Sequence, residues 1–245
     1  MKNKIYLILL CTVIFLFGQE GIALITKAKG KIEYKRNSDD KVFDKINKGL
    51  PLFDQDLLVT GSDGFAKYVY LDDGSLIKVH KNAEVYVYGA IDKRSIIKQI
   101  NVAEGNVKFE VARQGEGEFT VITPTSVASV KGTDFWLQTD EDDGDNFFGL
   151  SGLVNVTNIQ SNEIRQLTRN MTVTSLPDGS MDIKKTNPKD FKKLQSLELD
   201  VGEIDEVEFE QSLLEQSGEE LPEGEIKVQL DDGSGSLKEI IIKFK

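Results

Sequence analysis

Short runs of β-forming residues, separated by turn residues, dominate the chain between residues 24 and 187. Val107, Phe109 and Val111 alternate with charged residues, so one face of this strand is expected in the core and the other in water. Residues 84–88 alternate valines with tyrosines in the same way. About a dozen such runs, with no convincing helix before Asn187, predict an all-β fold, either an antiparallel β-sandwich or a β-roll of short strands.

Two glycine-containing turns are predicted in the middle of this region. The stretch Asp72-Asp73-Gly74-Ser75 joins two β-forming runs, and its Asp-Gly pair favours a hairpin because it supplies the positive φ angles of a tight turn. Two further strands are predicted at residues 96–102 and 107–111, on either side of Glu104-Gly105.

A third glycine lies in residues 119–137, which hold the bulkiest apolar cluster of the chain. Gly132 separates Val130 from Phe135-Trp136-Leu137. Glycine takes backbone conformations closed to other residues, so a bend at this position would let Val130 and Phe135 both reach the core.

The end of the chain, residues 188–245, differs in kind. Asn187 as N-cap and Pro188 as first helical residue predict a short helix. Its apolar residues are Phe191, Leu194 and Leu197. Residues 203–217 show an uneven helical stripe, and a terminal β-hairpin is expected within residues 225–244. These elements form a short α/β C-terminal appendage.

The beginning of the chain resembles a signal peptide. Lys2 and Lys4 precede an apolar run at residues 5–17, and small residues follow it, so residues 1–23 are expected to be cleaved and the protein to be periplasmic or secreted. An uncleaved anchor is the alternative. The apolar run is shorter than the roughly 18 residues of a membrane span, and no stable span is expected after cleavage. The only cysteine, Cys11, lies within this run, which leaves the mature chain without thiol chemistry.

These patterns divide the chain into a signal peptide at residues 1–23, an all-β domain at residues 24–187 and an acidic tail at residues 188–245. The total formal charge is −11. The tail alone holds 7 Lys and Arg against 16 Asp and Glu, a net of −9. Nucleic acids and anionic membranes bind clustered positive charge, so this balance disfavours both as partners.

Catalytic and metal-binding patterns are weak. The only histidine, His80, is interpreted as a solvated strand-end residue; without a second histidine or a cysteine it cannot anchor a typical zinc site. The chain lacks the Gly-x-Ser-x-Gly motif of a serine hydrolase. The acidic loop at residues 140–146 does not match the helix-loop-helix calcium motif, which leaves a solvated loop tip or an irregular calcium site.

Carboxylates and aromatic residues offer two further possibilities. Asp134, Glu104 and Glu110 are candidates for glycoside hydrolysis, although no spacing pairs two of them. The aromatic residues that alternate along predicted strands are either core residues or sugar-stacking residues. They are Tyr68, Tyr70, Tyr86, Tyr88 and Trp136. Tyr86 and Tyr88 are the preferred ligand face. We expect no catalytic residue, no cofactor and no metal.

Several motifs in order resemble the FecR-type extracytoplasmic domain. They include Asp73-Gly74-Ser75, Glu104-Gly105-Asn106-Val107, Thr123-Pro124, Val130-Lys131-Gly132-Thr133-Asp134-Phe135 and Gly152-Leu153-Val154-Asn155-Val156. The resemblance implies an all-β envelope module in which Gly74, Gly105, Lys131, Gly132, Thr133 and Phe135 are structural. The family's namesake passes a ferric-citrate signal to a cytoplasmic sigma factor. This chain has a signal-like segment where that regulator has its sigma-binding region, so sigma-factor control is not carried over.

These observations lead to the hypothesis of an exported, non-enzymatic interaction module of the bacterial cell envelope. Its expected partner is an envelope protein or a cell-surface glycan. The alternatives are a periplasmic sensor arm of a receptor-linked, iron-uptake-like signalling system, and a carbohydrate-binding or carbohydrate-active domain.

Overall fold

The computed structural model describes residues 20–37, 42–43, 46–93, 95–114, 119–140, 144–217, 224–231 and 237–244. The signal-peptide prediction covers residues 1–23, of which residues 1–19 lie outside the described residues. At its predicted end, Ala23 begins the first strand, and Ile22 and Ala23 are buried in the core. Residues 141–143 of the acidic loop also lie outside the described residues.

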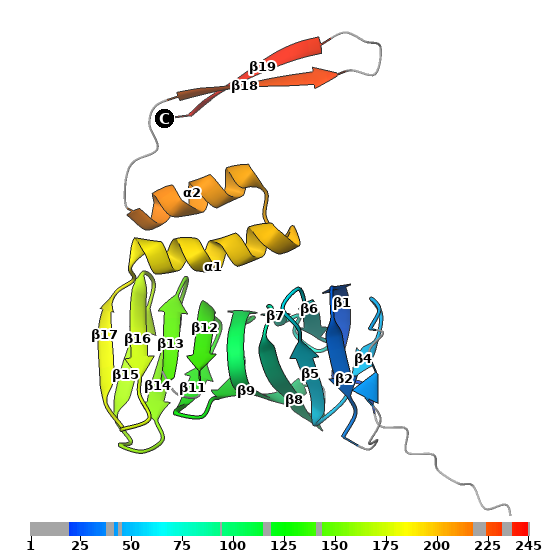
Figure 1. Ribbon diagram of the computed structural model, residues 1–245, viewed down its shortest axis with the longest axis vertical. Coiled ribbons are helices and arrows are strands. Elements are labelled where there is room, and N and C mark those ends of the chain that lie inside the picture. The colour runs from blue at the N-terminus through cyan, green and yellow to red at the C-terminus, as the bar shows by residue number, and fades with distance from the viewer. Residues whose placement is uncertain are drawn as a thin grey trace, which may run out of the picture.

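The β domain consists of two layers of strands that share one long strand (Figure 1). Layer A contains, in spatial order, β4 (Pro51–Leu52), β1 (Ala23–Lys29), β6 (Phe65–Tyr70), β7 (Leu76–Val79), β9 (Ser95–Glu110), β12 (Asp134–Asp140), β13 (Gly144–Gly149), β16 (Met171–Ser175) and β17 (Met181–Lys185). Layer B contains β3 (Val42–Phe43), β2 (Ile32–Lys35), β5 (Asp56–Thr60), β8 (Ala83–Asp92), β9, β10 (Phe119–Ile122), β11 (Ser126–Val130), β14 (Leu153–Asn158) and β15 (Ile164–Thr168). The pairing of β9 with β10 is parallel and the others are antiparallel, which confirms the predicted all-β class.

The shared strand β9 corrects the prediction of two strands around Glu104-Gly105. Its first half pairs with β8 and β10, and its second half pairs with β7 and β12. Gly105 lies where the strand leaves layer B for layer A, with a positive φ of 105°. A Cβ here would lie 2.4 Å from that of Ala83, so only glycine fits. The glycine bends one continuous strand instead of ending it.

The hydrophobic core lies between the two layers. Val107 and Phe109 point into it from β9, and Phe135 packs flat against Phe109 with ring centroids 4.7 Å apart. Val130 and Phe135 are both fully buried on either side of Gly132, whose φ is 115°. The predicted bend at Gly132 is therefore confirmed.

Two helices follow the strands: α1 (Pro188–Val201) and α2 (Glu206–Ser217). The predicted N-cap is confirmed, because the Asn187 side chain accepts a hydrogen bond from the backbone N–H of Lys189 at 2.9 Å. Figure 1 shows α1 next to the strands and α2 on its far side. Neither described helix has the length and apolar character needed to cross a membrane. The predicted terminal hairpin is formed by β18 (Gly224–Asp231) and β19 (Leu237–Phe244).

Candidate functional site

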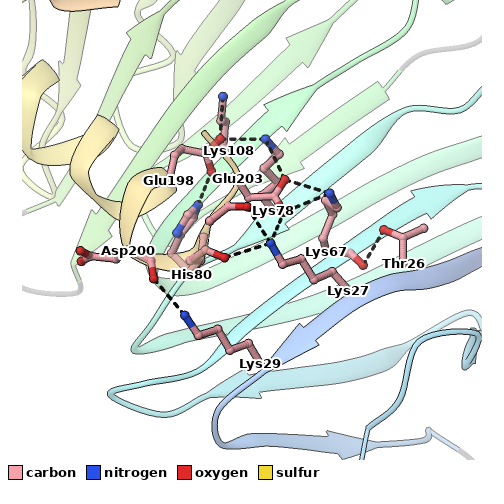
Figure 2. Close-up of polar contacts among 12 residues, drawn as sticks. Thr26, Lys27, Lys29, Lys67, Lys78, His80, Lys108, Glu198, Asp200 and Glu203 are labelled. Atoms are coloured by element: carbon pink, nitrogen blue, oxygen red, sulfur yellow. Dashed lines mark hydrogen bonds and ion pairs between the residues drawn. The ribbon is translucent and has the colours of Figure 1, made fainter. Parts of the chain in front are cut away.

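The outer face of layer A is basic, and α1 covers it. Lys67, Lys78 and Lys108 project from neighbouring strands β6, β7 and β9 toward the helix (Figure 2). The alternation of apolar and charged residues at positions 107–111 predicted that one face of this strand lies in water. That prediction is wrong for Lys108, whose side chain is only 12% exposed because α1 packs on it. The Lys78 side chain, on the neighbouring strand, is 9% exposed for the same reason.

Glu198 is the centre of this contact. It is fully buried, and its Oε2 accepts hydrogen bonds from Lys78 Nζ at 2.7 Å and Lys108 Nζ at 2.9 Å. Its Oε1 lies 2.9 Å from His80 Nε2. The ring nitrogen must donate, since an ionised carboxylate can only accept. One helical carboxylate therefore joins three side chains of the β domain.

Two further acids extend the contact toward the end of α1. Glu203 accepts hydrogen bonds from Lys27 at 2.8 Å and from Lys67 at 2.8 Å. Lys29 Nζ donates to the backbone carbonyl of Asp200 at 2.9 Å. Figure 2 shows these lysines converging on the helix from β1 and β6. Lysines at the carboxyl end of a helix also interact favourably with the helix dipole.

The pKa values in this network follow from burial and charge. Burial alone would raise the pKa of Glu198, but the hydrogen bond from His80 and the charges of Lys108 and Lys78 outweigh it and hold that pKa well below its usual range. Burial lowers the pKa of His80, and the attraction of Glu198 only partly opposes this. His80 is therefore neutral at pH 7, while Glu198 is charged.

His80 is thus not the solvated strand-end residue that the sequence predicted. Its side chain is 1% exposed and lies between the rings of Phe65 and Trp136, with centroid distances of 5.1 Å and 4.9 Å. Trp136 in turn packs against Leu194 and Leu197 of α1. Trp136 therefore cannot stack on a sugar, and the same holds for Tyr68 and Tyr70, which are buried.

Neither described helix covers the outer face of layer B, because α1 lies on layer A and α2 packs on the far side of α1. Tyr86 and Tyr88 lie on it, and Val85 and Val87 point into the core, as the alternation predicted. Both tyrosines are half-buried by their neighbours in the sheet. Burial and a hydrogen bond with Glu84 raise the pKa of Tyr86.

The glycine turn of the family motif borders this same face. Lys131, Gly132 and Thr133 line a shallow pocket of about 190 Å³ whose other walls come from layer B. Thr133 Oγ1 donates to the carbonyl of Leu153 at 3.0 Å, which fixes the turn. A Cβ at Gly132 would lie 2.8 Å from the Cα of Arg113. These residues form the wall of the pocket.

Gly74 lies in the hairpin between β6 and β7, with a φ of 75°. The two aspartates before it bind the fully buried Lys98: Nζ lies 2.7 Å from Asp72 and 3.0 Å from Asp73. Asp73 also accepts a hydrogen bond from Ser75 N at 2.9 Å. The family's Asp-Gly-Ser turn therefore holds a buried cation in place.

The structure brings two of the three candidate carboxylates to facing positions and leaves the third apart. Asp134 and Glu110 are opposite one another on β12 and β9, but Asp134 accepts a hydrogen bond from Ser151 and Glu110 pairs with Lys78. Glu104 lies near the other end of the β12 pairing, which rules out a three-acid cluster. Within the part of the chain that the structure describes, no group of three or more His, Cys, Asp or Glu could hold a metal ion.

Asp145 corrects the interpretation of residues 140–146 as a solvated loop tip, because it lies on β13 and is buried. It is fully buried and accepts hydrogen bonds from the hydroxyl groups of Thr123, Thr125 and Thr139. Because its two oxygens are already engaged, Asp145 does not favour a calcium site. The Thr123-Pro124 motif therefore has a structural role, in anchoring this carboxylate.

Comparison with known proteins identifies a family for part of the chain. A family model described as FecR protein matches residues 56–154, so the chain contains a FecR domain there and the resemblance is confirmed. Two crystal structures of a putative anti-sigma factor from Parabacteroides distasonis ATCC 8503 are similar at 21% identity, with TM-scores of 0.46 and 0.47. The matches cover 56% and 57% of this chain and only 62% and 64% of those proteins. No curated protein matches the chain.

Proposed function

We propose that the FecR domain makes this chain a non-enzymatic interaction module of the bacterial cell envelope, which binds an envelope protein or a cell-surface glycan through the outer face of layer B. One observation carries the proposal. The basic outer face of layer A is already covered by the chain's own helix α1, whose Glu198 binds Lys78 and Lys108, whereas no described helix covers the outer face of layer B.

A non-enzymatic role is supported by the way in which the reactive groups are used. His80 and Lys78 each bind Glu198, and Asp145 is held by threonines. These groups stabilise the fold and are buried, so a substrate does not reach them. The FecR motif residues form turns and a pocket wall. Export to the envelope is supported by the basic and apolar pattern of residues 1–23.

The test is retention of the purified chain by envelope fractions, with membranes and cell-wall material assayed separately. Asn155→Lys places a charge at an exposed position of the layer B face. Asp182→Lys makes the matching change at an exposed position on β17 of layer A. We expect wild type and Asp182→Lys to be retained and Asn155→Lys to be released. Equal retention of all three chains would disprove the use of this face.

A further inference from the structure

We infer that the outer face of layer B binds an extended, uncharged glycan chain that runs across the strands. The inference rests on the proposed function and names its ligand class. It follows from the arrangement of side chains in two parallel rows that the strand register defines.

The first row is polar. Cross-strand pairing aligns one outward-facing residue from each of six strands, β8, β9, β10, β11, β14 and β15. They are Tyr88, Gln99, Thr120, Ser129, Asn155 and Gln166. Each carries a hydroxyl or amide group that both donates and accepts hydrogen bonds, which is the chemistry that sugar hydroxyls require.

The second row is more apolar than the first. It lies two residues further along each strand, which places it about 7 Å from the first row. It consists of Tyr86, Asn101, Ile122, Val127, Thr157 and Ile164. A sugar ring has an apolar face of C–H groups and a polar rim of hydroxyls. The two rows match these two parts, with the C–H groups over the apolar row and the hydroxyls along the polar row.

Amide side chains of the two rows are already held by hydrogen bonds to one another. Gln99 Nε2 donates to Asn101 Oδ1 at 2.9 Å, so the two rows are linked on β9. Gln166 Nε2 donates to Asn155 Oδ1 at 3.3 Å between β15 and β14. A ligand therefore loses less side-chain entropy on binding than it would on a surface of free amides.

Charge decides the ligand class. Charged residues make up 29% of the chain, yet neither row contains one. The charges on this face lie at its margins and include Glu84 on β8, Lys131 at the end of β11, and Lys35 on β2, which is in register with Tyr86 two strands away. An anionic polymer or a charged protein surface would find no opposite charge along the rows, whereas a neutral glycan needs none.

The size of the face favours a chain over a single sugar. Five inter-strand steps of roughly 4.8 Å give about 24 Å from β8 to β15. The 190 Å³ pocket opens beside Ser129 and Asn155, in the polar row. It provides space for one substituent that projects from a sugar ring.

The test uses isothermal titration calorimetry of the full chain with hexa-N-acetylchitohexaose, cellohexaose and xylohexaose as neutral probes and an alginate hexamer as the anionic control. We expect at least one neutral hexamer to bind with an affinity that changes less than twofold between 50 and 500 mM salt, because no ion pair is formed. Alginate and the matching monosaccharide should bind at least tenfold more weakly.

Two variants locate the binding site. Tyr88→Ala and Asn155→Ala should each weaken binding at least tenfold, and Gln160→Ala, an exposed residue outside both rows, should leave it unchanged. Asn155 is exposed, so its variant remains informative if Tyr88→Ala does not fold. Failure of all three neutral hexamers, binding of alginate alone, or equal binding by the variants would overturn the inference.

The proposed envelope role and the proposed ligand class can each be wrong while the other is right. If Asn155→Lys releases the chain from membranes and an envelope protein is its partner, the face is an interaction site but the ligand class is wrong. If a neutral hexamer binds the rows while Asn155→Lys is retained by envelope fractions like wild type, the ligand class is right and the proposed envelope role is wrong.

Discussion

Replacing Glu198 with alanine tests how α1 is held on the β domain. The change removes the acceptor of hydrogen bonds from Lys78, Lys108 and His80 and leaves two buried ammonium groups with less compensation. Removing one partner of a buried ion pair costs about 3–5 kcal/mol. Lys78 keeps Glu110 at 3.1 Å and Glu203 at 3.3 Å, so we expect the lower end, about 3 kcal/mol of unfolding free energy.

The chain offers a direct reporter of this contact, because Trp136 is its only tryptophan and lies under α1. Urea titration followed by Trp136 fluorescence and by far-UV circular dichroism should show a lower midpoint, and thermal melting should fall by about 6–12 °C. Glu210→Ala, an exposed change on α2, should stay within about 0.5 kcal/mol of wild type.

A loss below about 1 kcal/mol in Glu198→Ala would refute the reasoning. It would mean that the apolar contacts of Leu194 and Leu197 with Trp136 hold the helix and that the ion pairs contribute little. Glu198→Gln, which keeps a hydrogen-bond acceptor but not the charge, should fall between alanine and wild type.

Three further predictions concern the core turn and pH. Gly132→Val should lower the free energy of unfolding by about 1–3 kcal/mol, because valine is strained at the positive φ angle of this position. Urea unfolding measures this loss, and a variant as stable as wild type would contradict the positive φ angle. Phe135→Ala should cost about 3–5 kcal/mol in the same assay, and a loss below about 1 kcal/mol would place this ring outside the core. The folded-state pKa values of His80 and Glu198 are both lowered, so the unfolded chain binds more protons than the folded chain as the pH falls. The free energy of unfolding should therefore decrease below pH 6.5, where unfolded His80 becomes protonated, and again below pH 4.5, where unfolded Glu198 does. Melting temperatures measured from pH 8 to pH 3 check this, and a melting temperature that rises toward pH 5 would contradict it.

Local patterns were enough to predict much of the fold. The strand alternation at Tyr86 and Tyr88, the bend at Gly132 and the N-cap at Asn187 each depend on residues close together in sequence, and the structure contains all three. The continuous strand β9 was missed because a glycine between two β-forming runs fits a turn and a bend equally well. The pairing of its second half with β7 and β12 makes this glycine a bend within one strand.

The covered basic face was not predictable from local pattern, because its ion pairs join residues 90 to 176 positions apart. A weak signal existed in α1. Glu198 lies on the same helical face as Leu194 and Leu197, and an acid within an apolar stripe indicates a buried partner. His80 was misassigned for the same reason, since nothing near it in sequence shows that a helix covers it. The candidate site on layer B required the register, which aligns Tyr88 with residues of five other strands.

Site-specific crosslinking in intact cells tests the central claim most directly, namely that layer B carries the binding face and layer A does not. A photo-crosslinking amino acid would replace Gln166 on layer B or Lys184 on layer A, both exposed. The account predicts an adduct with an envelope component from Gln166 and none from Lys184. An adduct from Lys184 alone, or from neither position, would contradict it.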